Sequence, residues 1–117
     1  MKKEEFLKRT MNFGLRVIRV VQSLPKNQVA TVLGNQLLRA GTAVGANYRA
    51  AVRGKSRADF ISKMGNVEEE CDEALYWMEM LIESGSIKRK LLKALMDEGD
   101  EILSIVVASI KTARRNK

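Results

Sequence analysis

Residues 56–85 read SRADFISKMGNVEEECDEALYWMEMLIESG, and this stretch decides the fold. Its apolar residues recur at alternating intervals of four and three, the spacing of a helix that buries one seam against its neighbours. That seam consists of Phe60, Met64, Val67, Cys71, Ala74, Met78 and Leu81. Ser56 is a typical N-cap, Asp59 suits the positive end of the helix dipole, and Gly85 is a typical helix end. The stretch therefore predicts one long helix within a bundle.

Helical periodicity continues on both sides of this stretch. The further helices that we expect cover residues 3–23, 28–54 and 87–114. Pro25 ends the first of them, because the residue before a proline disfavours helical geometry, and Gly54 suits the end of the second. Sustained period-two alternation and hairpin turn sequences are absent, which argues against strands. Connections of two to four residues make consecutive helices antiparallel, so we predict a single all-α domain, an up-down-up-down four-helix bundle.

Two features predict how the first two helices pack. The helix over 3–23 carries two adjacent apolar stripes, which predict a wide buried face. The second stripe consists of Leu7, Met11, Gly14, Ile18 and Val21. The helix over 28–54 carries Gly34, Gly41 and Gly45 along one face. Each interior glycine costs about 0.5–1 kcal/mol relative to alanine, so we expect another helix to pack tightly on this face.

The charges of the chain are divided by segment. Residues 1–57 carry twelve Lys or Arg and two acids, residues 58–84 carry one Lys and eight acids, and residues 85–117 carry eight basic and four acidic residues. The net charge is +7, and the pI is near 9.8, in the range of nucleic-acid binders. The same charge would also serve solubility alone. We expect a positive surface that meets an anionic partner.

Basic residues share one face on each of the first two helices. If these helices are neighbours, the two faces would merge into one basic strip. The residues that we expect to contact phosphates are Arg9, Arg16, Arg19, Arg49, Arg53, Lys55 and Arg57. The alternative is that such cations pair with the acids of residues 58–84. A hairpin that turns near residues 55–56 places Arg39 opposite Asp72 and Glu73, so we assign Arg39 a structural role.

Composition argues against several kinds of site. The chain has no His and one Cys, which leaves no disulfide and disfavours a zinc site or a His-based nucleophile. The acids of residues 68–73 cover too many directions around a helix to converge on a metal. We expect a buried, structural Cys71, no catalytic residue, no metal and no cofactor. The most apolar stretch, residues 102–110, is too short to span a membrane, and we expect a soluble cytoplasmic protein.

Surplus apolar residues predict self-association. Trp77 and Met80 lie off the seam of residues 60–81, and the helix around Ile105 and Val107 is apolar nearly all round. A surplus apolar face usually marks an interface. We therefore expect Trp77, Met80, Ile105 and Val107 at contacts between copies of the chain, with deeper burial inside the monomer as the alternative.

Three segments resemble a known family. They are RAGTAVGANYRAA at 39–51, RGKSRADFISK at 53–63 and VEEECDEALYW at 67–77. They are similar to bacterial four-helix bundle proteins known as 23S rRNA intervening sequence proteins, whose name records genes that lie inside rRNA insertions. The resemblance implies a ring-like homopentamer. It also implies a relation to accessory proteins of diversity-generating retroelements, basic bundles that bind nucleic acid and a reverse transcriptase. Ala50 replaces a Glu found in many relatives, which makes this helix more basic.

Two functions follow as expectations. The first is a non-enzymatic, oligomeric protein that binds the backbone of RNA or DNA with low sequence specificity. The alternative is a protein-interaction scaffold or accessory subunit that docks an acidic partner such as a reverse transcriptase. Carboxylates that converge in a pocket would instead favour an enzyme.

Overall fold

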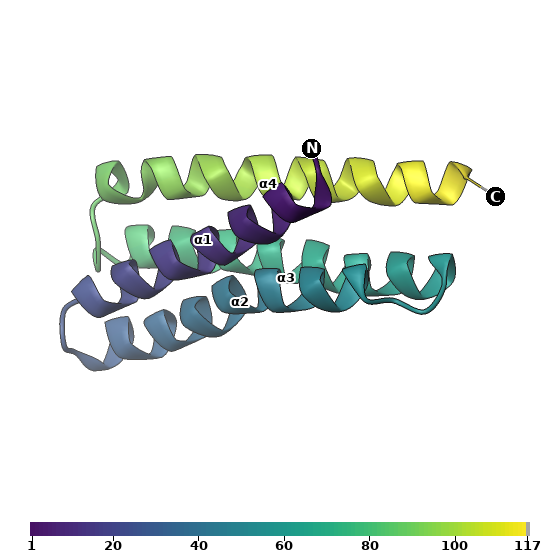
Figure 1. Ribbon diagram of the computed structural model, residues 1–117. Helices are drawn as coiled ribbons and strands as arrows, with labels where there is room; N and C mark the ends of the chain where they lie inside the picture. The colour runs from purple at the N-terminus through teal and green to yellow at the C-terminus, as the bar shows by residue number, and fades with distance from the viewer. Residues whose placement is uncertain (117) are drawn as a thin grey trace.

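The computed structural model describes residues 1–116 and confirms the four predicted helices (Figure 1). They are α1 (Lys3–Ser23), α2 (Gln28–Val52), α3 (Arg57–Glu83) and α4 (Arg89–Arg115), and this described part of the chain contains no strand. Consecutive helices run in opposite directions and pack side by side, in a bundle of 50 × 21 × 21 Å.

The helix ends follow the local sequence signals. The Ser56 hydroxyl accepts a hydrogen bond of 3.0 Å from the Asp59 amide and caps α3 as predicted. At the other end of α3, Gly85 has a φ of +77°, and the amides of Gly85 and Ser86 donate to the carbonyls of Ile82 and Leu81. This Schellman arrangement uses a conformation that glycine adopts without strain. The second helix ends at Val52, two residues earlier than expected, because the Gly54 amide bonds back to Ala51 in a tight turn.

The predicted seam of α3 forms the centre of the core. Its residues from Met64 to Leu81 are fully buried, whereas Phe60, in the first turn, is half-buried at the end of the bundle. Facing it, α4 buries Leu92, Leu95, Gly99, Ile102, Val106 and Ile110. The rings of Phe6 and Tyr48 meet edge to face at 4.7 Å and join α1 to α2. The prediction of a helical core from seam spacing is confirmed.

The first helix packs less completely than predicted. It crosses the bundle obliquely and rests mainly on α2, with a light contact to α4 (Figure 1). The second apolar stripe is only partly buried, and Met11 within it is 63% exposed. The first stripe is largely buried and consists of Phe6, Thr10, Phe13, Val17, Val20 and Leu24. The prediction of a wide buried face is therefore wrong in part. The first stripe fills the space between α2 and α4, which leaves the second at the outer margin of the α1–α2 contact.

The glycines of α2 allow the close approach that the sequence predicts. A Cβ placed on Gly41 would lie 2.7 Å from a methyl carbon of Val17, and one on Gly45 would lie 3.3 Å from the backbone of Thr10. A Cβ on Gly34 would lie 2.9 Å from Leu24. The two helices therefore approach closely because these three positions of α2 carry no side chain.

We expect Gly41→Ala to lower the free energy of unfolding by about 1–3 kcal/mol, although alanine favours helices, because Val17 is fully buried and has no room to move. The matched control is Gly65→Ala in α3, where a Cβ would meet no atom within 4 Å. This control should gain about 0.5–1 kcal/mol. Urea denaturation of the two variants measures both values, and equal effects would contradict the packing role of Gly41.

Candidate nucleic-acid interface

Arg9 is bound within the bundle and is not available as predicted. Its Nε and Nη2 atoms donate to the two carboxylate oxygens of Glu98 on α4, both at 2.7 Å, and Nη2 also lies 2.8 Å from Glu101. These bonds lower the pKa of Glu98, with a smaller contribution from Arg16. We therefore remove Arg9 from the expected phosphate ligands. The ion pairs of Arg9 hold α1 against α4, two helices that otherwise have little contact.

Arg39 has the structural role predicted for it, with a different second partner. Its guanidinium binds Glu73, as expected, and Glu70 at 3.2 Å. Asp72 is exposed, because the α3 edge that faces α2 carries residues 70 and 73, three apart, and position 72 points to the outside. The expected pairing with Asp72 is wrong. Trp77 joins this cluster, since its indole N–H donates to Glu73 at 3.2 Å.

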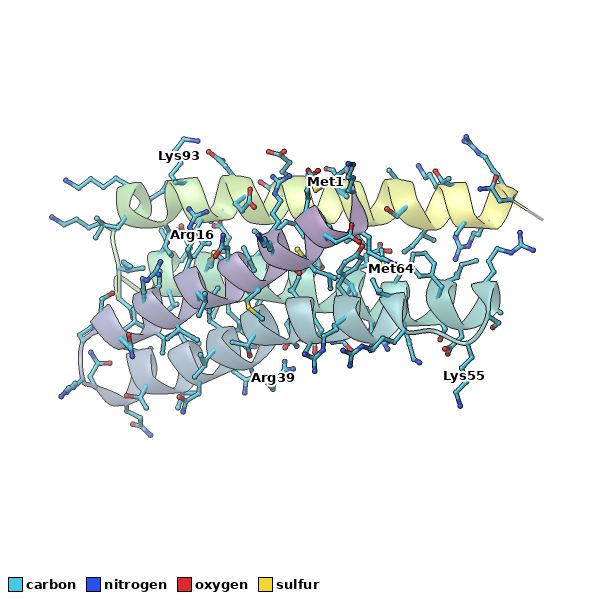
Figure 2. The ribbon with its side chains drawn as sticks, viewed as in Figure 1. Met1, Arg16, Arg39, Lys55, Met64 and Lys93 are labelled. Carbon is cyan, nitrogen blue, oxygen red and sulfur yellow. The ribbon has the colours of Figure 1, made fainter. Side chains whose placement is uncertain are left out.

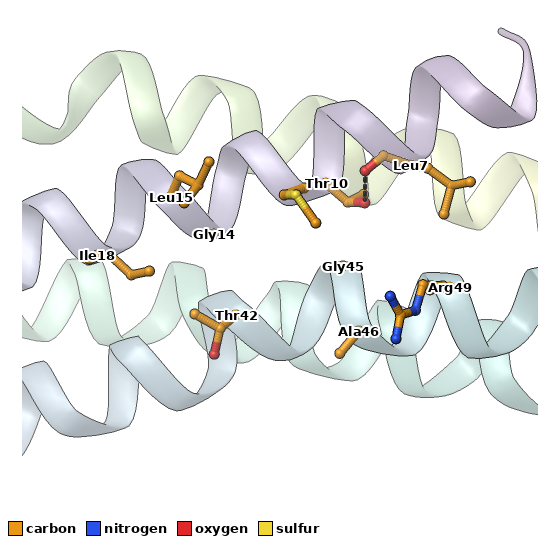
Figure 3. Close-up of a pocket in the computed structure, with 10 residues that line it drawn as sticks. Leu7, Thr10, Gly14, Leu15, Ile18, Thr42, Gly45, Ala46 and Arg49 are labelled. Carbon is orange, nitrogen blue, oxygen red and sulfur yellow. Dashed lines mark hydrogen bonds between the residues drawn. The ribbon is translucent and has the colours of Figure 1, made fainter.

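The basic faces of α1 and α2 do not merge into one strip. Arg16 projects between α1 and α4, whereas Arg39 projects from the opposite side of the bundle (Figure 2). An apolar groove lies between them, along the outer edge of the α1–α2 contact (Figure 3). The expectation of a merged strip fails because the second apolar stripe of α1 occupies that position. Arg19 stays exposed on the outer side of α1.

Six exposed cations gather at one end of the bundle. Arg53, Lys55 and Arg57 are exposed where α2 turns into α3, and Figure 2 shows Lys55 pointing outward from the bundle at that turn. The C-terminal end of α4 lies at the same end (Figure 1) and adds exposed Lys111, Arg114 and Arg115. We call these six residues the basic end. Within residues 1–116, none of the six makes an ion pair.

The nearest acid to this turn in the sequence, Asp59, is satisfied locally. Its carboxylate accepts from the Lys55 amide at 3.0 Å and from the Lys63 ammonium at 2.9 Å. These bonds, the amide first, lower its pKa. The ion-pair partner of Asp59 is Lys63, which does not belong to the basic end. Lys111, Arg114 and Arg115 of α4 are not among the residues that the sequence led us to expect at phosphates. Antiparallel topology alone, however, places the C-terminus of α4 beside the α2–α3 turn.

The described residues hold no group that suggests catalysis. Burial raises the pKa of Cys71 to about 12, and its thiol donates to the Gly99 carbonyl at 3.3 Å. The prediction of a buried, structural cysteine is confirmed. Over residues 1–116, no three carboxylate or thiol side chains come together as metal ligands. None of the helices in this range is long and apolar enough to cross a membrane.

The four residues expected at an oligomer interface are half-buried within the monomer. They are Trp77, Met80, Ile105 and Val107. Trp77 and Ile105 also pack against the core of their own chain. The largest exposed apolar side chains lie elsewhere, at Met1, Met11, Leu15, Val29, Val32, Tyr76 and Leu91. Tyr76 adjoins the predicted set, because its ring meets that of Trp77 edge to face at 5.0 Å.

Comparison with known proteins places the chain in a family. The sequence profile described as 23S rRNA-intervening sequence protein matches residues 2–108. The chain belongs to this family. Four solved chains also match, among them the crystal structure of a protein of unknown function from the S23 ribosomal protein family of Bacteroides thetaiotaomicron. That structure is 33% identical, with a TM-score of 0.88, and the match covers 95% of this chain and 99% of the other. No curated protein matches.

In this intervening-sequence family member, the Arg9–Glu98 pair should make stability depend on pH. The folded pKa of Glu98 is lowered, so the pair stabilises the fold above the unfolded value of about 4.3 and loses its effect as the pH falls through the folded pKa. At pH 7 we expect Glu98→Gln to cost about 1–2 kcal/mol of unfolding free energy.

Urea denaturation across pH 3–7 checks this expectation. The difference between wild type and Glu98→Gln should shrink toward zero at the acid end. Glu69→Gln, which changes an exposed acid of α3, is the matched control and should show little difference throughout. A Glu98→Gln deficit that stays constant with pH would mean that the side chain acts by packing and not by charge.

Proposed function

We propose that this protein is a non-enzymatic, oligomeric bundle that binds the phosphate backbone of RNA or DNA with low sequence specificity. The observation that carries the proposal is the basic end. Three helix termini there bring six exposed cations together, and the adjoining segments 49–58 and 105–116 contain no acid. Arginine presents donors in a fork that matches phosphate oxygens. Clustered cations of this kind bind nucleic acid through the release of counterions.

The character of the surface supports low specificity. Sequence-specific recognition of single-stranded RNA stacks bases on aromatic side chains while their edges are read by hydrogen bonds, and the basic end contributes no aromatic side chain. Three of the residues first expected to contact phosphates belong to the basic end, namely Arg53, Lys55 and Arg57. Arg49 lies one turn away from it on α2. Arg16 and Arg19 lie apart from it on α1. We therefore assign the principal contacts to the basic end.

Fluorescence anisotropy with labelled RNA and duplex DNA at several salt concentrations tests this function. We expect binding at low salt that weakens steeply as salt rises, and at least a tenfold loss in Arg53→Glu/Arg57→Glu. The salt slope of that variant should fall by about two, one for each lost phosphate contact.

The matched control is Lys88→Glu/Lys90→Glu, which makes the same charge change at the opposite end of the bundle. New acids at the start of a helix do not destabilise it. This control should retain binding within a few-fold. Equal losses in the two variants would mean that total charge and not the basic end drives binding. The absence of wild-type binding at low salt would refute the nucleic-acid function and favour docking of an acidic protein.

We further propose that the chain assembles with itself, as the homopentameric ring that the family resemblance implies. Five copies would bring five basic ends into one particle and multiply the +7 charge of the chain. Support comes from α3, where exposed Tyr76 and half-buried Met80 lie one turn apart beside Trp77. Ile105 and Val107 on α4 are the second candidate contact.

Light scattering coupled to size-exclusion chromatography should give a mass near five times the 13.1 kDa of the chain. Met80→Glu should reduce this mass, because a charge placed in an apolar contact is costly to bury. Gln22→Glu, at an exposed site on α1, should leave it unchanged. A monomer at micromolar concentration would refute the assembly, and a large particle insensitive to Met80→Glu would move the interface away from α3.

A further inference from the structure

A groove runs along the outer edge of the contact between α1 and α2. It has a volume of about 540 Å³ and is lined mainly by apolar and small side chains (Figure 3). Its lining residues on α1 run from Leu7 to Ile18, and those on α2 from Thr42 to Arg49. At a rise of 1.5 Å per residue, the α1 side is about 16 Å long, or three helical turns.

The walls of the groove are apolar side chains that the fold does not bury. Met11 is 63% exposed and Leu15 is 43% exposed. They follow one another along α1 at a spacing of four, with Leu7 one turn before and Ile18 one turn after. Exposing such a row to water is unfavourable by about 25 cal/mol for each Å² of apolar surface, so the row gains from a partner that covers it.

The floor of the groove is made of small residues. Gly14 and Gly45 leave the backbones of α1 and α2 close together, and Ala46 is exposed beside them. Because the lining extends over three helical turns of α1, an elongated occupant such as a helix covers it more fully than a compact small molecule does.

Charge around the groove specifies the partner. Arg49 is the one charged side chain among the ten residues that line it. Exposed Arg53 continues this edge on α2, which contains no acid, and exposed Lys8 and Arg19 flank the apolar row on α1. An occupant with acidic flanks would meet cations on both sides, whereas a basic one would be repelled.

We propose that the α1–α2 groove binds an amphipathic helix of another protein, with apolar residues on one face and Asp or Glu on both flanks. The apolar face of this helix covers Met11 and Leu15, and its acids meet Arg49 and Lys8. Apolar lining gives no advantage to a phosphate backbone, so this surface serves a partner distinct from the ligand of the basic end. The inference does not rest on the proposed nucleic-acid function.

A designed peptide tests the proposal with the full-length protein. The probe is a labelled peptide of about 18 residues, or five helical turns, with Leu at positions i, i+4, i+7 and i+11 and Glu on both flanks. We expect saturable anisotropy with the wild type and at least a tenfold weaker affinity for Met11→Glu and for Ala46→Glu. Both sites are exposed, so neither change disturbs the core.

The matched control variant is Val32→Glu, which places the same charge on an exposed apolar site of α2 outside the groove. It should bind the peptide within a few-fold of wild type. Two control peptides complete the comparison, one with the same composition in scrambled order and one with Lys in place of Glu. Both should bind at least tenfold more weakly than the probe.

Methyl NMR locates the bound peptide independently of affinity. With labelled methionine methyl groups, the Met11 signal should shift on titration, while those of buried Met64 and Met78 should stay in place.

Three outcomes would overturn the proposal. They are no binding of the probe at about 0.1 mM, equal binding of the scrambled peptide, and an unchanged Met11 signal. A fourth result that would overturn the proposal is the loss, in Met11→Glu, of the oligomer that the wild type forms. A second copy of this chain would then be the occupant of the groove.

Discussion

The close contact of α1 with α2 is the constraint that shapes the groove and decides which cations of α1 are paired. Val17 occupies the space that a side chain at Gly41 would need, and Gly45 brings α2 against the backbone of Thr10. This contact fixes the rotation of α1 about its own axis. As a result, the second apolar stripe of α1 lies above the outer edge of α2 and forms the groove. The same rotation turns Arg9 toward α4, where Glu98 binds it.

Ion pairing decides where the positive charge of the chain remains available. Arg9, Arg39, Lys63, Arg89 and Lys93 all pair with carboxylates. The more exposed of these pairs add little stability, about 0–1 kcal/mol each, but all of them neutralise the cations that they contain. The six cations of the basic end keep their charge, because helix ends from distant parts of the sequence meet there without an acid to match each of them.

The groove and the basic end adjoin at the C-terminal end of α2. Arg49 borders the groove, and Arg53, four residues later on the same helix, belongs to the basic end. The two surfaces differ in kind, since one is a concave apolar channel and the other a convex cluster of cations on helix ends. An acidic helix and a phosphate backbone would therefore select different surfaces of one small protein, with α2 shared between them.

The amino-acid sequence alone specifies the number and order of the helices, their ends to within two residues, the buried seam of α3 and the close packing of the α2 glycines. These features depend on local periodicity, caps and side-chain size, which are written in neighbouring residues. It also placed Arg39 opposite Glu73, because a short hairpin fixes the register of adjacent helices. Three features become known only from the packing of the helices: Arg9 is paired, the second stripe of α1 is only partly buried, and α4 adds Lys111, Arg114 and Arg115 to the basic end. Those outcomes depend on the rotation and tilt of α1 and on contacts between residues about ninety positions apart. Helical periodicity specifies which residues share a face of a helix, but it does not specify which neighbouring helix that face meets.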